Sequence, residues 1–260
     1  MSVRIELING ECASEMLSIP DESIDLVVTS PPYDTIRTYN GFVFDFEKIA
    51  NQLFRVLKKG GVCVWIVADE TKDFKESTTS FLQALYFCKI GFGLLDTMIY
   101  AKENVPPTYP NMKRYAPAFE FMFVFSKGKP NTFNPIKDRK NKEYGTEKHS
   151  TTQRQKNGDL VDAGSYIPTE YGIRFNVWSY HVGKNKDTKD AIALEHPARF
   201  PESLAHDHIL SWSNPGDTVL DPMMGSGTTG KMAKLLNRNF IGIEISEKYM
   251  EIAEKRMGFV

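Results

Sequence analysis

Ile24-Asp25-Leu26-Val27-Val28-Thr29-Ser30-Pro31-Pro32-Tyr33 indicates a strand that ends abruptly. Its apolar first half is typical of a buried parallel strand. Neither Pro31 nor Pro32 can donate to a sheet ladder, and each restricts the residue before it, so the chain leaves the sheet in a stiff, extended turn. The carbonyls of Ser30 and Pro31 are then expected to be unpaired beside the ring of Tyr33. These groups could hold a planar group that bears an amine, although a lone motif of this kind is more often a plain strand exit.

A second motif lies far along the chain, where an apolar run ends at Asp221 and a glycine-rich loop follows. The spacing Gly225-x-Gly227-x-x-Gly230, with Glu244 at the end of the next apolar run, is that of a nucleoside-binding β-α-β unit. The glycines let the backbone approach the ligand, and the glutamate can accept hydrogen bonds from both ribose hydroxyls. A dinucleotide is the default ligand, but Asp221 would repel a pyrophosphate and suits a cationic amino-acid group. S-adenosylmethionine has such a group and no phosphates, so the sequence favours it.

Apolar strands alternate with amphipathic helices on both sides of these motifs. Strands are expected at residues 3–8, 24–30, 62–67, 94–101, 119–125, 218–221 and 240–243. Helices are expected at residues 12–17, 79–89 and 201–212, from Asp45 to a stop at Gly60-Gly61, from the glycine-rich loop to about Leu236, and from Ser246 onward. This order predicts an α/β fold with a doubly wound, mainly parallel sheet and helices on both faces. The strands that end at Ser30 and Asp221 can be neighbours that flank a topological switch point.

A basic segment interrupts the pattern. Residues 127–156 contain nine Lys or Arg against three acidic residues, with few apolar side chains. Such a run is usually a solvated or disordered surface. Its interleaved aromatics, Phe133 and Tyr144, and its position inside the chain favour an insertion that contacts phosphates. The apolar segment 175–178 is expected to close this insertion.

The composition limits the class of protein. A chain of 260 residues with 41% hydrophobic content can bury a large core, and its 32 basic and 33 acidic residues imply no global charge that would demand a nucleic-acid partner. Three cysteines without CxxC spacing argue against a disulfide framework or a metal site. No targeting segment or membrane span is visible, so a cytoplasmic location is expected.

Three motifs together resemble those of the exocyclic-amine (N4-cytosine / N6-adenine) DNA methyltransferases. They are Ser30 to Tyr33, Asp221 to Thr229, and His196-Pro197-Ala198-Arg199-Phe200-Pro201-Glu202. The catalytic motif precedes the cofactor motif, which is the permuted order of the beta class. The resemblance implies a Rossmann-like, seven-stranded-type methyltransferase domain at residues 1–126 and 195–260, and an inserted target-recognition region at residues 127–194.

The resemblance also implies site residues. The catalytic set would be Ser30, Pro31, Pro32 and Tyr33. S-adenosylmethionine would contact Phe200, Pro201, Asp221, Pro222, Met223, Gly225, Ser226, Gly227, Thr228, Thr229, Glu244 and Ile245. DNA would contact Lys113, Arg114, Lys137, Arg139, Lys140, Lys142, Arg154 and Lys156. The family often has Gly-Asp early in the chain, where this sequence has Gly10-Glu11, so Glu11 receives no role.

The expected reaction is transfer of a methyl group from S-adenosylmethionine to the exocyclic amine of a base turned out of double-stranded DNA. By family resemblance, serine at position 30 points to cytosine N4, and adenine N6 is the alternative. A methyltransferase for RNA or protein amides is a more distant alternative. A nicotinamide-dependent oxidoreductase would leave Ser30 to Tyr33 unexplained, and a non-catalytic nucleic-acid-binding protein would leave both motifs without a task. A cognate restriction endonuclease and a second copy of the chain are the further partners expected.

Overall fold

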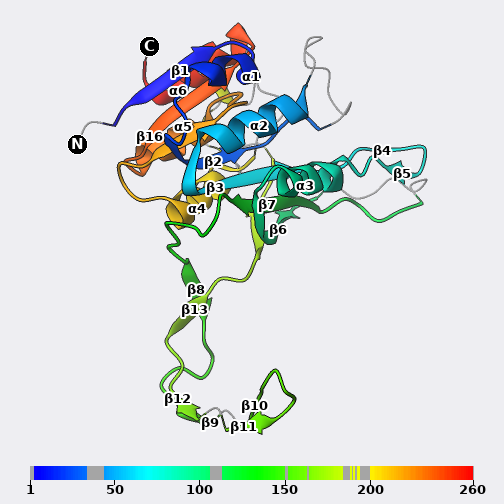
Figure 1. Ribbon diagram of the computed structural model, residues 1–260, viewed down its shortest axis with the longest axis vertical. Coiled ribbons are helices and arrows are strands. Elements are labelled where there is room, and N and C mark those ends of the chain that lie inside the picture. The colour runs from blue at the N-terminus through cyan, green and yellow to red at the C-terminus, as the bar shows by residue number, and fades with distance from the viewer. Residues whose placement is uncertain are drawn as a thin grey trace. The chain divides into compact units, whose positions relative to one another are not determined.

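An eight-stranded sheet forms the centre of the computed structural model, which describes residues 3–33, 44–105, 113–149, 152–162, 164–183, 188, 190, 192–193 and 200–259. The strand order is β1-β16-β15-β2-β3-β7-β6-β14 (Figure 1). Strand β7 runs antiparallel to both of its neighbours, and the other adjacent pairs are parallel. The predicted α/β class and mainly parallel sheet are therefore confirmed.

The strands of this sheet are β1 (Ile5–Asn9), β2 (Ile24–Thr29), β3 (Leu57–Val67), β6 (Gly93–Glu103), β7 (Phe119–Ser126), β14 (Val177–His181), β15 (Thr218–Asp221) and β16 (Asn239–Glu244). A small hairpin, β4 (Thr71–Lys72) and β5 (Lys75–Glu76), follows β3. Strand β14 was not expected. It pairs with β6 and has five residues, of which Trp178 and Tyr180 are buried. This alternation is too short to predict a strand from the sequence.

Helices cover both faces of the sheet. One layer contains α1 (Cys12–Glu15) with a 3-10 turn at Met16–Ser18, α2 (Phe46–Val56) and α3 (Thr79–Lys89). The other contains α4 (Glu202–Trp212), α5 (Thr228–Leu235) and α6 (Glu247–Met257). The expected stop of α2 at Gly60-Gly61 is wrong. The helix ends at Val56, and both glycines lie within β3, where Gly60 has φ +79° and falls at a shift in the register between β2 and β3.

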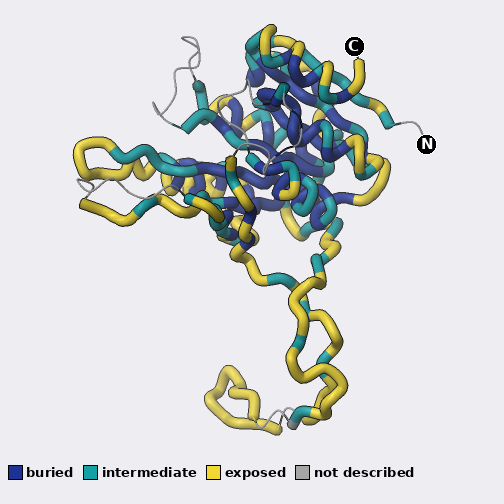
Figure 2. Tube along the Cα trace, turned by 180° about the vertical axis from the view of Figure 1, so that it is seen from behind, coloured by how far each residue is buried: buried dark blue, intermediate teal, exposed yellow. Residues whose placement is uncertain are grey.

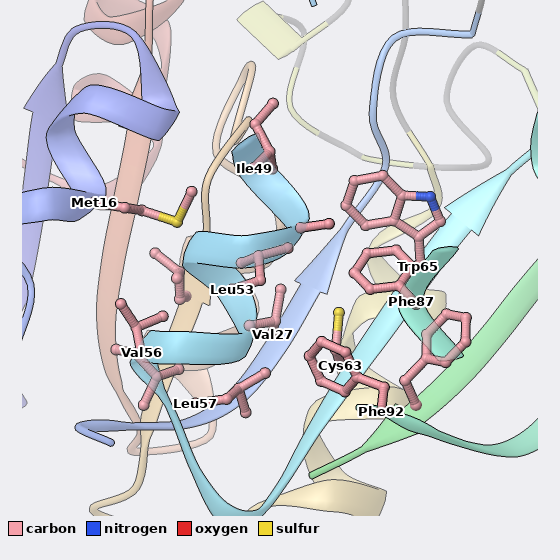
Figure 3. Packing of buried hydrophobic residues seen from close by; sticks show 14 of the residues in the cluster. Met16, Val27, Ile49, Leu53, Val56, Leu57, Cys63, Trp65, Phe87 and Phe92 are labelled. Carbon is pink, nitrogen blue, oxygen red and sulfur yellow. The ribbon is translucent and has the colours of Figure 1, made fainter. Parts of the chain in front are cut away.

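The core beneath the first layer combines aliphatic side chains with a cluster of aromatic rings. Asp45 is the N-cap of helix α2, and its carboxylate accepts a hydrogen bond from Lys48 N. The helix buries Ile49 and Leu53 against the sheet. Trp65 of β3 and Phe87 of α3 pack edge to face with ring centroids 5.1 Å apart (Figure 3). This packing buries the Trp65 side chain of β3 completely.

The order in which successive strands are added to the sheet reverses between β15 and β2. These strands are parallel neighbours, with Val219 opposite Leu26. From β2 the chain passes through α2 to β3, whereas from β15 it passes through α5 to β16 on the other side. A switch point therefore lies between the strands that end at Thr29 and Asp221, as the sequence predicted.

The chain divides into two compact units. Unit 1 comprises Met1–Asn134 and Asn176–Val260, and unit 2 comprises Pro135–Phe175. Unit 2 contains three short antiparallel pairs, β8 (Lys137–Lys140) with β13 (Tyr171–Ile173), β9 (Lys148–His149) with β12 (Ser165–Tyr166), and β10 (Gln153–Arg154) with β11 (Leu160–Val161). Figure 2 shows unit 2 mostly in the colour of exposed residues. The wider division at residues 127–194 stays a prediction. None of the helices in the described ranges combines the length and apolar character that a membrane crossing requires.

Candidate active site

A buried carboxylate lies at the switch point. Asp221 ends β15 and is 2% exposed. Its Oδ1 accepts a hydrogen bond of 2.7 Å from the Thr29 hydroxyl at the end of β2, and its Oδ2 accepts one of 2.8 Å from the Thr229 hydroxyl. Burial raises the pKa of Asp221 to about 6, although these hydrogen bonds lower it. One carboxylate thus joins β15, β2 and the start of α5.

A second buried carboxylate ends the neighbouring strand. Glu244 is 8% exposed, and burial raises its pKa. Its two oxygens accept hydrogen bonds of 2.9 Å from the backbone N–H groups of Gly225 and Ser246. The Ile245 backbone also bonds to this carboxylate, and acceptor capacity remains for a ligand. Within the described ranges, neither Asp221 nor Glu244 has a cationic partner, so this edge of the sheet is a buried anionic site.

The glycine loop packs directly on its supports. Gly227 has φ +75°, and a Cβ atom there would lie 2.9 Å from Cβ of Ala253 in α6. A Cβ atom on Gly230 would lie 2.5 Å from the Phe240 ring in β16. Both glycines therefore allow close packing of loop, helix and strand.

A buried arginine of α6 bonds to the backbone of the same loop. The Arg256 side chain is fully buried, and it donates hydrogen bonds of 2.6 Å to the Ser226 carbonyl and to Glu202 Oε1. It also pairs with Asp190 at 3.1 Å, and Lys231 bridges the same two carboxylates. These charge-assisted bonds tie the start of α4, helices α5 and α6, and the glycine loop together.

The first motif lies at the same edge. Ser30 Oγ and the Tyr33 hydroxyl are 2.8 Å apart, and the Tyr33 hydroxyl donates to Glu120 Oε2 at 2.8 Å. Glu120 Oε1 forms an ion pair of 2.6 Å with Lys102 at the end of β6. Because β2 ends at Thr29, the carbonyls of Ser30 and Pro31 lie beyond the strand and outside its regular ladder.

The comparison with known proteins decides the family. The model of the DNA methylase family (N6/N4 type) matches residues 24–255. The chain belongs to the exocyclic-amine DNA methyltransferases. The orphan methyltransferase M.BamHII of Bacillus amyloliquefaciens is 53% identical over 92% of this chain and 91% of its own length. The DNA adenine methyltransferase YhdJ of Escherichia coli is 29% identical over 96% of this chain and 82% of its own length. The cytosine-N4-specific PvuII DNA methyltransferase has the same fold, with a TM-score of 0.70 and 19% identity over 98% of this chain and 87% of that one.

S-adenosylmethionine is the cofactor of this methyltransferase, and DNA is its substrate. The residues present fit the cofactor. Two buried carboxylates with raised pKa values suit a ligand that brings a positive charge and two ribose hydroxyls. The glycines beside them let the loop pack closely against α6 and β16, which positions it next to both carboxylates.

The structure brings most of the predicted cofactor residues together around the methyltransferase's glycine loop. Pro222, Gly225, Ser226, Gly227, Thr228 and Thr229 are buried there, and Met223 and Ile245 are half-buried. Pro201 caps α4, and Phe200 precedes it. The start of that motif, His196 to Arg199, lies outside the described residues.

The predicted DNA-contacting residues fall in both units. Lys113 and Arg114 are in unit 1, where Arg114 bonds to Thr71 and to Glu76 of the small hairpin. The other six belong to unit 2 and are exposed. Arg139 also stacks on Phe175 at 4.5 Å.

Four residues that structure the site were missed in the sequence. Thr29 lies in the first motif, but the sequence predicted no role for it. Glu120 is a lone charge in an otherwise apolar strand, a signal that could have been noticed, and Lys102 is the last cation before the proline-rich loop. Arg256 carried no signal, because it is one of many charges on α6.

Proposed function

We propose that this methyltransferase acts on a base turned out of double-stranded DNA and prefers the N4 amine of cytosine. The observation that carries the proposal is the Thr29–Asp221 hydrogen bond of 2.7 Å. It joins the strand end that leads to Ser30 with the strand end that leads to the glycine loop. An acceptor base over β2 and a methyl donor over β15 would then meet at the switch point.

Residues of the glycine loop are the proposed cofactor contacts. Asp221 would take the ammonium group of the methionine portion, and Glu244 would take both ribose hydroxyls through its remaining acceptor positions. Phe200 and Pro201 would pack against the methionine portion. When bound, the cofactor supplies an electrophilic methyl group on a sulfonium.

Ser30 to Tyr33 are the proposed contacts of the base. The Ser30 hydroxyl and the Pro31 carbonyl would accept hydrogen bonds from the two amine hydrogens, Pro32 would stiffen the turn, and the Tyr33 ring would stack on the base. Accepting both hydrogens favours the positive charge that develops on the nitrogen. A nitrogen–carbon bond forms as the sulfur–carbon bond breaks, and one amine proton leaves to solvent.

The basic residues of unit 2, together with Lys113 and Arg114, are the proposed contacts of the DNA backbone. Their exposed charges suit phosphate binding. The target-recognition region would extend over residues 127–194. A cytoplasmic location and a homodimer belong to the same proposal. M.BamHII is named an orphan methyltransferase, and that name gives no support to a cognate endonuclease.

The choice of base rests on Ser30. Serine at this position favours cytosine by family resemblance, whereas the name of YhdJ favours adenine. Both amines need the same acceptors, so the adenine N6 reaction is the second candidate.

Labelled methyl transfer tests the proposal. DNA would be incubated with the enzyme and S-adenosylmethionine carrying a labelled methyl group, and then digested to nucleosides. N4-methylcytosine should carry the label, with the Asp221→Ala variant as the inactive control. N6-methyladenine as the sole product would overturn the choice of cytosine. Sequencing of DNA from cells that express the enzyme would then identify the recognition site.

A further inference from the structure

Three side chains form a directed chain of hydrogen bonds at the acceptor side of the site. The Tyr33 hydroxyl donates its hydrogen to Glu120 at 2.8 Å. A tyrosine hydroxyl has only one hydrogen, so in its 2.8 Å contact with Ser30 it must accept. Ser30 is therefore the donor in that contact. The Ser30 hydrogen points to the Tyr33 hydroxyl, so the Ser30 oxygen can accept a hydrogen bond from a ligand.

An ion pair fixes the far end of this chain. Glu120 Oε1 lies 2.6 Å from Lys102 Nζ, and the two side chains are 12% and 26% exposed. One carboxylate oxygen of Glu120 therefore faces Lys102, and the other accepts the hydrogen of Tyr33. Strand β7 brings Glu120 to this position because it runs antiparallel, which places its first residues at the edge where β3 ends.

We propose that Glu120 is a positioning residue that makes the Ser30 hydroxyl a hydrogen-bond acceptor toward the base, so that the site selects a base with an exocyclic amine over one with a carbonyl at the same position. The proposal rests on the proposed function, since it requires Ser30 to face the base. An amine offers hydrogens to the Ser30 oxygen. A carbonyl in that place would bring two acceptors together and leave both without a hydrogen.

The Glu120→Gln variant should reverse the chain. Lys102 requires an acceptor, so the amide oxygen would face Lys102 and the amide NH2 would donate to Tyr33. The Tyr33 hydrogen would then point to Ser30, and Ser30 would turn its own hydrogen toward the base. Tyr33→Phe keeps the ring for stacking but removes the hydroxyl, so Ser30 would be able to rotate either way.

The test measures DNA affinity without turnover. Two duplexes would carry the recognition site, one with the target cytosine and one with uracil, which has a carbonyl in place of the amine. If labelling identifies adenine as the acceptor, hypoxanthine replaces it in the second duplex. Affinities would be measured by fluorescence anisotropy with the demethylated cofactor product present. Differences in pairing between the two duplexes affect every variant alike and cancel in a ratio between variants.

The wild-type preference for the amine duplex should fall about tenfold in Glu120→Gln, equivalent to about 1.4 kcal/mol, and by a smaller factor in Tyr33→Phe. Glu22→Gln, which alters an ion-paired glutamate near the start of β2, should keep the wild-type preference. Equal weakening on both duplexes, or an unchanged preference in both variants, would overturn the proposal. Failure of the proposed function would be seen separately, as absence of labelled product with the wild-type enzyme.

Discussion

The hydroxyl of Thr29 donates a 2.7 Å hydrogen bond to the carboxylate of Asp221, across 192 positions of the sequence. Both side chains are buried, and each ends a strand at the switch point. The bond therefore sets the spacing between the two halves of the site.

Replacing Thr29 with valine should destabilise the enzyme at neutral pH. The shape is kept, but Asp221 loses a donor, and leaving a buried acceptor unsatisfied costs about 1–3 kcal/mol. Urea unfolding measures the loss. Thr29→Ser, which keeps the hydroxyl, is the matched control, and equal losses in the two variants would show that the methyl group of Thr29 matters more than its hydroxyl.

Ionisation of Asp221 should make stability depend on pH. Burial raises its pKa from 3.8 to about 6 in the folded protein, so the stability it contributes is full below about pH 4 and is lost as the pH rises through about 6. Between pH 4 and 7 the wild type should lose about 2–3 kcal/mol relative to Asp221→Asn, which cannot ionise. Chemical unfolding of both proteins across this range measures the difference. A difference that stays constant with pH would contradict the raised pKa.

The affinity for the cofactor should change with pH in the opposite direction to the stability. A cationic ligand favours the ionised carboxylate, so the affinity for S-adenosylmethionine should rise as the pH increases through about 6. Isothermal titration calorimetry would test this with the wild-type enzyme. An affinity that falls over the same interval would argue against contact between Asp221 and the ammonium group.

Adding a methyl group to Gly227 should disturb the loop more than the same change at an open turn. Gly227 and Gly128 have φ of +75° and +86°, so alanine is strained at both, but only Gly227 has a neighbour, Ala253, within 3 Å of the new Cβ atom. Gly227→Ala should cost about 1–3 kcal/mol more than Gly128→Ala and should raise the KM for S-adenosylmethionine. Similar losses in both variants would mean that α6 moves aside at little cost.

Removing the Arg256 side chain should destabilise the glycine loop and the helices around it. The Arg256→Ala variant leaves Asp190 and Glu202 with only Lys231 as a cationic partner among the described residues, and it frees the Ser226 carbonyl. We expect a loss of about 2–4 kcal/mol in the free energy of unfolding. Arg4→Ala, at an exposed pair, should cost less than about 0.5 kcal/mol. Full rescue by Arg256→Lys would show that charge alone, and not the forked geometry, holds the loop.

The sequence predicted the fold and the placement of both motifs because apolar parallel strands and glycine loops leave strong local patterns. Helix α3 has the predicted bounds, and β15 ends at Asp221 as expected. Whether the predicted residues bind cofactor and DNA stays a prediction.

The supporting residues could not be predicted, since each depends on distant partners. The direction of β7 is not encoded in its apolar run, and only that direction brings Glu120 to Tyr33. Arg256 of α6 meets Asp190 and Glu202, which lie 66 and 54 positions earlier in the sequence. Such contacts are properties of the tertiary arrangement.

The pairing of β1 with β16 places Ile5 opposite Phe240, so strands from opposite ends of the sequence are neighbours in one sheet. A chain joined near these strands and opened within unit 2 would keep every neighbour in the large sheet. It would, however, encode the glycine loop before the Ser-Pro-Pro-Tyr turn. The two halves of the site can therefore follow one another in either order along a chain, whereas β15 and β2 must stay neighbours in the sheet.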